Sequence, residues 1–326
     1  QKLGIHLVFT CVPEQYQRIV YPKEKLPFTR FIQILTGYIS PALEHYLCKK
    51  TADRKTTIAY RGRSLPYWYG TLGQEKEYIG IKMKECCLKN NIPQDIEHDD
   101  AKRIYGDDWY KFLASSKATL GTESGANIFD YSGEISHQVK SYLEEHPCAT
   151  YQEVFKLFLQ QHEGIVKMNQ ISPKIFEAIC LHTALILFEG EYSGVVEADK
   201  HYIPLKKDFS NIDEVLAKAC DDAYLSQLTQ RAYTDIVLSQ KYSYQSFINF
   251  FDTTISTFVH RAKKIEDVIR EKELAEDNTY YKLFIPSISP TKAIKKTLSR
   301  VKNRMPPSAK KIIRVIVPKA IRQKLV

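Results

Sequence analysis

Residues 169–194 read NQISPKIFEAICLHTALILFEGEYSG and carry the clearest local signals in the chain. Ser172 followed by Pro173 is typical of a helix start, with a capping residue and then proline at the first helical position. Residues 184–188 are all apolar, which predicts a short strand covered on both faces. The stretch therefore predicts a helix, a turn and a buried strand, in that order.

The start of this predicted helix has the chemistry of a nucleotide-sugar site. A helix N-terminus presents unpaired backbone N–H groups that attract anions, and phosphate is the anion commonly bound there. Ser172 and Lys174 lie at that start, and Glu177 follows one and a half turns into the helix. Because a carboxylate at that depth can accept hydrogen bonds from sugar hydroxyls, we expect these three residues to bind a nucleotide-sugar donor.

Strand and helix patterns alternate along the middle of the chain. Strands are predicted at residues 57–60, 95–98 and 118–121, and helices at residues 73–90 and 107–116. Such alternation indicates a parallel sheet with right-handed crossovers. Further segments are predicted as a strand at 3–12, a strand or helix at 31–39, and helices at 137–161, 212–264 and 266–277.

Polar residues follow the ends of three predicted strands, 57–60, 118–121 and 184–188. Ligands of open parallel sheets bind at the carboxyl ends of strands, where these loops should meet. Arginine offers a two-pronged donor for phosphate oxygens, although a surface ion pair is the alternative role. A loop with Gly and Ser lets the backbone approach a phosphate or sugar, although it can also be an ordinary turn. The candidates are, in strand order, Arg61 and Arg63, then Glu123, Ser124 and Gly125, then Glu191.

The same segments carry a family resemblance. Residues 169–194 resemble the donor-site motif of glycosyltransferases with the GT-B fold, of the group 1 type found in surface-polysaccharide synthesis. In that family a strand, a loop and a helix carrying Phe-Glu-Ala bind the donor nucleotide, and the Glu, matched here by Glu177, holds the ribose. The resemblance extends over residues 58–216 and includes YRGR at 60–63, GTESGA at 121–126 and HYIPL at 201–205.

Two positions depart from the family pattern. The family's helix usually ends in Gly-Thr-Pro, whereas this chain has His182 followed by Thr183 and Ala184. Histidine tolerates the left-handed conformation better than most residues, so we expect the helix to end there with a weaker cap. Many retaining members carry a second Glu eight residues before the first, where this chain has Asn169. The resemblance therefore leaves open whether transfer retains or inverts the sugar configuration.

The resemblance implies an α/β protein with a GT-B-like, parallel Rossmann-type sheet and flanking helices. We expect residues 1–55 to end an N-terminal acceptor-side domain and its linker, and residues 56–265 to form the Rossmann-like donor domain. Residues 266–326 should form an exposed helix and a helical basic tail. A length of 326 residues suffices for two domains, and the first residue, Gln rather than Met, fits a fragment or a processed protein.

The implied function is that of a metal-independent glycosyltransferase that needs no cofactor. It would move a sugar from a nucleotide-activated donor to a glycan or lipid-linked acceptor. GT-B enzymes stabilise the leaving diphosphate with basic side chains and a helix dipole. No residue is singled out as the catalytic base. Two alternatives stay open: a catalytically inactive GT-B-like binding or scaffold protein, and a CDP-polyol phosphotransferase of similar fold.

Composition argues against several other classes. The seven cysteines are odd in number and show no Cys-x-x-Cys spacing, which indicates a reducing intracellular compartment. The nine histidines show no zinc-binding spacing. The sequence contains no run of about 18 apolar residues, so it predicts no membrane-spanning helix. The apolar residues near the start fit a strand better than a secretory signal.

Net charge is +9, and the excess is confined to one end of the chain. Residues 291–326 hold twelve of the 47 Lys and Arg residues and no Asp or Glu, so the other 35 basic and 38 acidic residues sum to −3. Apolar residues at 312–325 lie among these cations, as in basic amphipathic segments at anionic membranes. A disordered solubilising tail is the alternative, and nucleic acid is less favoured because few aromatics interleave. We therefore expect a cytoplasmic protein, peripheral at the inner face of the membrane.

Overall fold

The computed structural model describes the chain except for residues 1–4, 44–45, 47 and 274–326. Contacts group Gln1–Val259 as one compact unit and His260–Val326 as another. Helix α9, Tyr244–Glu273, runs from the first unit into the second, so the domain boundary expected at residue 265 falls inside a helix. The expected boundary at residue 55 lies within the first unit. The basic tail and the end of the helix predicted at 266–277 lie outside the described residues.

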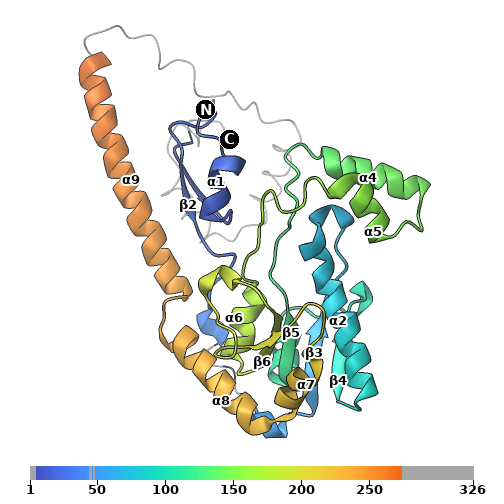
Figure 1. Cartoon of the computed structure of the whole chain (residues 1–326). Helices are drawn as coiled ribbons and strands as arrows, with labels where there is room; N and C mark the ends of the chain where they lie inside the picture. The colour runs from blue at the N-terminus through green and yellow to red at the C-terminus, as the bar shows by residue number, and fades with distance from the viewer. Residues whose placement is uncertain (1–4, 44–45, 47, 274–326) are drawn as a thin grey trace, which may run out of the picture. The chain divides into compact units, whose positions relative to one another are not determined.

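Five parallel strands form the main sheet, in the order β4-β3-β5-β6-β7 (Figure 1). Their bounds are β3 Thr56–Arg61, β4 Gln94–Glu97, β5 Ser116–Gly121, β6 Ala184–Phe188 and β7 Ile203–Leu205. The predicted parallel α/β sheet is confirmed. Since β4 pairs with one side of β3 and β5 with the other, the strand order reverses between β3 and β5. Ligands of open α/β sheets bind at the carboxyl ends of strands at such a point.

Helices cover both faces of this sheet. Strand β6 is buried along its whole length, as its apolar run predicts. Ile186 packs toward α2, α7 and α8, whereas Leu185 and Leu187 pack toward α6, because successive side chains of a strand point to opposite faces. Helix α3 contacts β5 and α6. The bounds are α2 Thr71–Lys89, α3 Asp107–Ala114, α6 Pro173–Cys180, α7 Ile212–Cys220 and α8 Asp222–Ala232.

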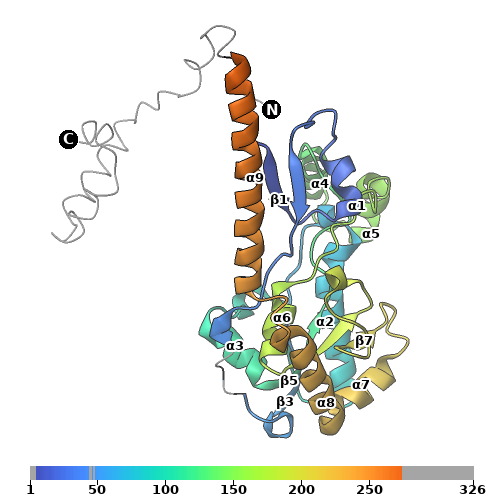
Figure 2. The ribbon, with the colours of Figure 1, turned by 90° about the vertical axis from the view of Figure 1, so that its left-hand side faces the viewer.

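A second sheet contains two parallel strands, β1 Leu7–Thr10 and β2 Arg30–Gln33, joined through helix α1, Glu14–Val20. The strand predicted at 3–12 is therefore shorter, and the segment at 31–39 contributes a strand rather than a helix. Figure 2 shows β1 beside the part of α9 that belongs to the first unit, Tyr244 to Val259. Phe9 of β1 lies 4.6 Å from Phe251 of α9, measured between ring centroids, so aromatic packing joins the two.

The remaining helices connect these elements. The helix predicted at 137–161 is divided, because residues 146–150 contain Pro147, which cannot continue a helix. Its parts are α4 Glu134–Glu145, α5 Tyr151–Val154 and a π-helix at Phe155–Leu159, and a second π-helix spans Tyr233–Leu238. Short 3-10 helices span Pro41–Leu43, Thr51–Asp53, Tyr67–Tyr69, Asp100–Lys102 and Tyr192–Gly194. Within the described part of the chain, no helix combines the length and apolarity that crossing a bilayer requires.

Candidate anion-binding site

A cavity of about 370 Å³ opens where β3 and β5 end and α6 begins. Five of its lining residues are basic, and none of the described residues that line it is acidic. The basic ones are Arg61, Arg63, Lys76, Arg103 and Lys174. The others are Tyr60, Gly62, Ile104, Tyr105, Gly106, Trp109, Tyr110, Thr122, Ser124 and Ser172. This composition favours an anionic ligand that also has an aromatic or apolar part.

Two lysines of the cavity have pKa values lowered by burial and by neighbouring positive charge. The Nζ of Lys174 lies 4.3 Å from the centroid of the Tyr60 ring. Burial, with Lys76 as a second cause and Glu177 opposing, lowers the pKa of Lys174 to about 7. Lys76 donates to Oγ of Ser124 at 3.3 Å, and burial followed by Arg63 lowers its pKa too. An anion between these lysines would relieve their repulsion and favour the charged amines.

The two predicted arginines have different roles in the structure. The guanidinium of Arg61 forms an ion pair with Asp95 at 2.9 Å, donates to the carbonyl of Lys102 at 3.0 Å, and lies 4.3 Å above the Phe112 ring. It is therefore held against β4 and α3, which does not fit the expected phosphate clamp. Arg63 is exposed and forms no ion pair among the described residues. Of the pair, only Arg63 keeps its donors for a ligand.

The start of α6 lacks the side-chain hydrogen bonds that cap the start of α2. Ser172 occupies the predicted capping position, but its side chain makes no capping hydrogen bond and lines the cavity instead. At the start of α2, the carboxylate of Glu163 accepts the N–H of Thr71 at 3.3 Å, and Oδ1 of Asn127 accepts that of Leu72 at 2.9 Å. The chain's own oxygens therefore occupy the start of α2, whereas the start of α6 can receive an external anion.

Glu177 lies next to the cavity without lining it. Its Oε2 accepts a hydrogen bond of 2.8 Å from Nε1 of Trp109, and Trp109 lines the cavity. The carboxylate is thereby oriented by α3. The sequence analysis missed both Trp109 and Lys76. No local signal could have found them, because each reaches the cavity from a helix whose position depends on the tertiary fold.

The loop after β5 divides into ligand-facing and structural residues. Ser124 lines the cavity, and its backbone pairs with Gln170. Glu123, expected to bind the donor, is buried, and its carboxylate accepts hydrogen bonds from Asn169 at 2.5 Å and from the backbone of Tyr192 at 2.9 Å. Gly125 has φ +119°, and a Cβ there would overlap the carbonyl of Met168. Its missing side chain serves a close approach of two chain segments rather than of a ligand.

Of two other predicted features, the position of Glu191 differs from the prediction and the conformation of His182 agrees with it. Glu191 is exposed and does not line the cavity, so the structure does not bring it together with the other candidates. His182 does adopt the predicted left-handed conformation, with φ +49°, and its ring stacks on Tyr233 at 4.4 Å between centroids. The turn between α6 and β6 therefore survives without glycine.

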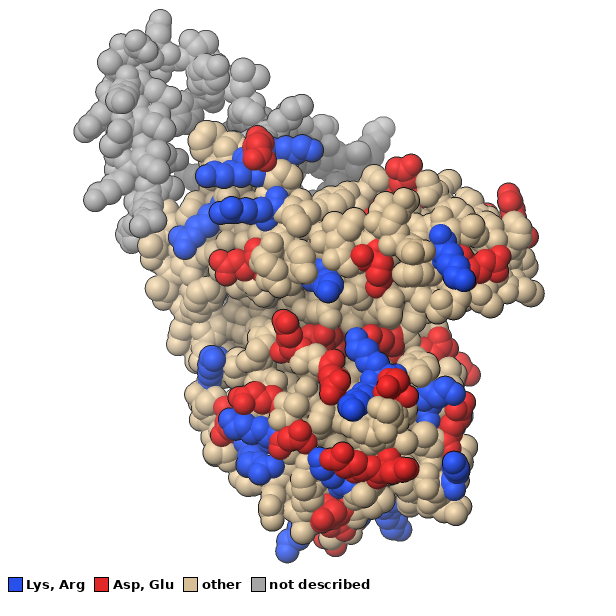
Figure 3. All heavy atoms as spheres, viewed as in Figure 1, with Lys and Arg blue, Asp and Glu red and all other residues tan. Residues whose placement is uncertain are grey.

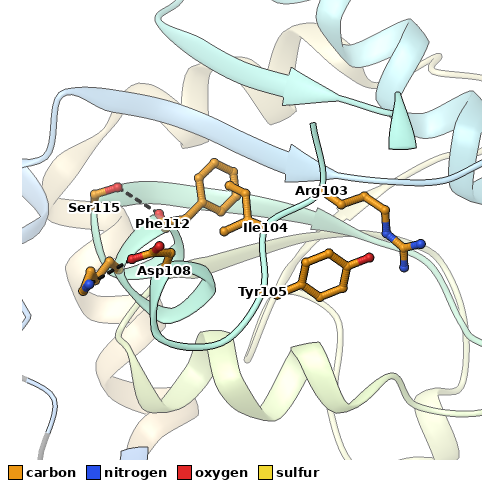
Figure 4. A pocket seen from close by; sticks show the side chains of 7 residues that line it. Arg103, Ile104, Tyr105, Asp108, Phe112 and Ser115 are labelled. Atoms are coloured by element: carbon orange, nitrogen blue, oxygen red, sulfur yellow. Dashed lines mark hydrogen bonds and ion pairs between the residues drawn. The ribbon is translucent and has the colours of Figure 1, made fainter. Parts of the chain in front are cut away.

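A broader, shallow hollow of about 610 Å³ lies beside α3 and shares Arg103, Ile104 and Tyr105 with the cavity (Figure 4). Its Lys111 forms an ion pair with Asp108 at 2.9 Å, so that charge is already balanced. Figure 3 shows Lys, Arg, Asp and Glu side chains intermixed on the face viewed there. In the smaller cavity Arg61 and Arg103 are also paired, with Asp95 at 2.9 Å and Asp100 at 3.6 Å, but Arg63, Lys76 and Lys174 form no ion pair among the described residues. These three cations are thus the feature that indicates a binding site.

Comparisons with known proteins give no family assignment. No family model matches the chain, and no curated protein matches it. Among solved structures, TarM is 12% identical with a TM-score of 0.37, covering 76% of this chain and 42% of that one. An alpha-glucosyltransferase, in complex with UDP and a 13-mer DNA containing a HMU base, is 12% identical with a TM-score of 0.44, covering 77% and 65%. The pneumococcal O-GlcNAc transferase GtfA, in complex with UDP and GlcNAc, is 14% identical with a TM-score of 0.35, covering 78% and 46%.

These similarities are loose, and the chain spans less than two thirds of the length of each of these structures. At such identities and TM-scores they establish neither family nor activity. The geometry of the cavity therefore carries the functional argument.

Proposed function

We propose that this chain contains the nucleotide-sugar donor site of a GT-B-type glycosyltransferase. The enzyme would transfer a sugar from a nucleotide-activated donor to a glycan or lipid-linked acceptor, at the cytoplasmic face of a membrane. The observation that carries the proposal is the cavity at the ends of β3 and β5, with Arg63, Lys76 and Lys174 free of ion pairs among the described residues and a carboxylate, Glu177, beside it.

The proposed donor fits the distribution of charge in and around this cavity. Arg63, Lys76 and Lys174 would bind the diphosphate together with the start of α6. Glu177 would accept hydrogen bonds from the ribose, since Trp109 occupies only its Oε2. Tyr105 and Trp109 line the cavity and offer apolar surface for the rest of the nucleoside.

The same cations would also assist the transfer reaction itself. When the glycosidic bond to the donor breaks, negative charge develops on the departing diphosphate. Positioned cations and a helix start stabilise such charge without a metal ion. Replacing Lys174 or Arg63 should therefore slow transfer as well as weaken donor binding.

A thermal-shift screen with nucleoside diphosphates tests the site first. A ligand at about 100 times its dissociation constant should stabilise the protein by about 2.7 kcal/mol. We expect a nucleoside diphosphate to stabilise it more than the matching nucleoside does, because the cations contact the phosphates. No stabilisation by any nucleoside diphosphate would refute the proposed donor site.

Donor turnover then separates the proposed enzyme from its alternatives. Slow hydrolysis of a nucleotide-sugar without acceptor indicates a glycosyltransferase, whereas turnover restricted to a CDP-polyol indicates a phosphotransferase. Binding of nucleoside diphosphates without any turnover would indicate a non-catalytic binding protein. The Lys174→Ala variant is the control, because activity from a contaminating enzyme would be unaffected by it.

A further inference from the structure

Phe28, in the loop between α1 and β2, is exposed to an unusual degree. It is 71% exposed, the largest exposed fraction among the large hydrophobic side chains that the structure describes. A phenylalanine carries about 150–250 Å² of surface, so most of a large apolar group faces water. Ile5, 48% exposed, belongs to the segment that is hydrogen-bonded to this loop.

Hydrogen bonds on both sides hold Phe28 in this position. The N–H of Lys25 donates to the carbonyl of Pro22 at 3.0 Å, and that of Thr29 donates to Leu26 at 3.3 Å, so the loop is folded into two turns. Oγ1 of Thr29 then donates to the carbonyl of Ile5 at 2.7 Å. The exposure of Phe28 is therefore a property of a folded loop, which presents the ring between Pro27 and Thr29.

Four cations lie close to Phe28 in the sequence. Arg18, Lys23, Lys25 and Arg30 are exposed, and Glu24 is the one acidic residue within positions 18–30. None of these four cations forms an ion pair among the described residues. The segment from Arg18 to Arg30 thus combines one highly exposed aromatic side chain with four cations that have no ion pair among the described residues.

We propose that residues 22–29 form a membrane-docking loop, in which Phe28 enters the interface of an anionic bilayer and the flanking cations contact lipid headgroups. Phenylalanine, like tryptophan and leucine, is typical of the apolar side chains that interfacial segments bury at a membrane surface, and cations near an anionic leaflet are attracted to it. A protein-docking surface would call for a contiguous apolar patch. Here one exposed aromatic side chain lies within ten residues of four exposed cations, which complements lipid phosphates better. The inference is independent of the nucleotide site.

Sedimentation of the full chain with vesicles tests the docking loop. We expect binding to phosphatidylcholine vesicles that contain phosphatidylglycerol, and little binding to phosphatidylcholine alone. Phe28→Ala should reduce the vesicle partition coefficient about tenfold, which is the lower end of the effect of burying one phenylalanine side chain. Lys23→Ala with Lys25→Ala should reduce it about 25-fold, since each cation contributes about fivefold. Leu88→Ala, which truncates a side chain that is 62% exposed on α2, is the control and should bind as the wild type does.

A second measurement separates the loop from the basic tail, which also favours anionic vesicles. In the Phe28→Trp variant, the fluorescence of the introduced indole should shift to shorter wavelength and be quenched by lipids brominated in the acyl chains. The native Trp68 and Trp109 provide the background in the unmodified chain. Binding without quenching of the introduced indole, or equal binding of Phe28→Ala and wild type, would overturn the proposal, as would a complete lack of binding to anionic vesicles.

Discussion

The side-chain amide of Asn169 donates a hydrogen bond of 2.5 Å to Oε2 of Glu123. Oε1 of the same carboxylate accepts the backbone N–H of Tyr192 at 2.9 Å, and a Cβ on Gly190 would lie 2.9 Å from its carboxyl carbon. Glu123 thereby joins the loops that follow β5 and β6 to the segment before α6. An ionised carboxylate at position 169 could not donate this hydrogen bond to Glu123.

Asn169→Glu should destabilise the protein, because it places a second carboxylate against buried Glu123. We expect a loss of about 1–3 kcal/mol in the free energy of unfolding at pH 7.5, measured by denaturant titration. Repulsion should raise the pKa of one carboxyl in the folded variant above its unfolded value, so the loss should shrink as pH falls toward 5. A loss of the same size at both pH values would contradict this account, and Asn169→Gln is the neutral control.

Glu177→Gln should weaken binding of a nucleoside diphosphate by about 1–3 kcal/mol, the range for losing a hydrogen bond to a charged group. Binding of inorganic diphosphate should change little, because it lacks the ribose. Calorimetry with both ligands measures the difference. Equal loss for the two ligands would show that Glu177 acts on the site as a whole rather than on the sugar.

Arg63→Ala should mainly lower the affinity for diphosphate, whereas Arg61→Ala should mainly lower stability. Arg63 is exposed and without an ion pair among the described residues, so its replacement should weaken diphosphate binding by about 1.5–3 kcal/mol with little change in stability. Arg61 contacts Asp95 and the Phe112 ring, so its replacement should lower the melting temperature. Thermal unfolding and diphosphate titration of both variants check this, and an undiminished affinity of Arg63→Ala would remove it from the site.

Affinity for diphosphate should fall as pH rises above about 7, the pKa of Lys174 in the unliganded site. Above that pH, binding must take up a proton, which costs up to about tenfold in affinity per pH unit. Arginine remains charged, so Lys174→Arg should show a flatter pH profile. Without ligand, the unfolded chain holds this proton more tightly than the folded one, so the free energy of unfolding should rise between about pH 7 and 10. Calorimetry in two buffers of different ionisation enthalpy measures the proton uptake on diphosphate binding. Identical uptake by the wild type and by Lys174→Arg would exclude Lys174 as its source.

Removal of residues 291–326 should weaken binding to anionic vesicles and leave nucleoside-diphosphate binding intact. This segment has twelve positive charges and no acidic residue. Each cation near an anionic surface contributes about 1 kcal/mol, and the attraction is screened over about 8 Å at physiological ionic strength. The bound fraction should therefore fall with added salt in vesicle sedimentation. Tight, salt-sensitive binding to RNA in place of lipid would favour a nucleic-acid partner instead.

The amino-acid sequence by itself determined the local elements. Ser172-Pro173 predicted the start of α6, the apolar run at Ala184–Phe188 predicted β6 to the residue, and His182 was expected to take the left-handed conformation that it has at φ +49°. These features follow from the steric limits of each residue and from the period of buried side chains, which act over a few neighbouring positions. The parallel sheet followed in turn from the alternation of strands with helices.

Only the tertiary structure decided which polar side chains face the cavity. Arg61 and Arg63 are two residues apart, yet Asp95 holds the first against β4 while the second stays free of ion pairs among the described residues. Lys76 reaches Ser124 across 48 positions, and Trp109 reaches Glu177 across 68. Such partners are set by the packing of α2, α3 and α6 against the sheet. A long side chain next to a strand end can turn toward either side, and the partner within its reach decides the direction.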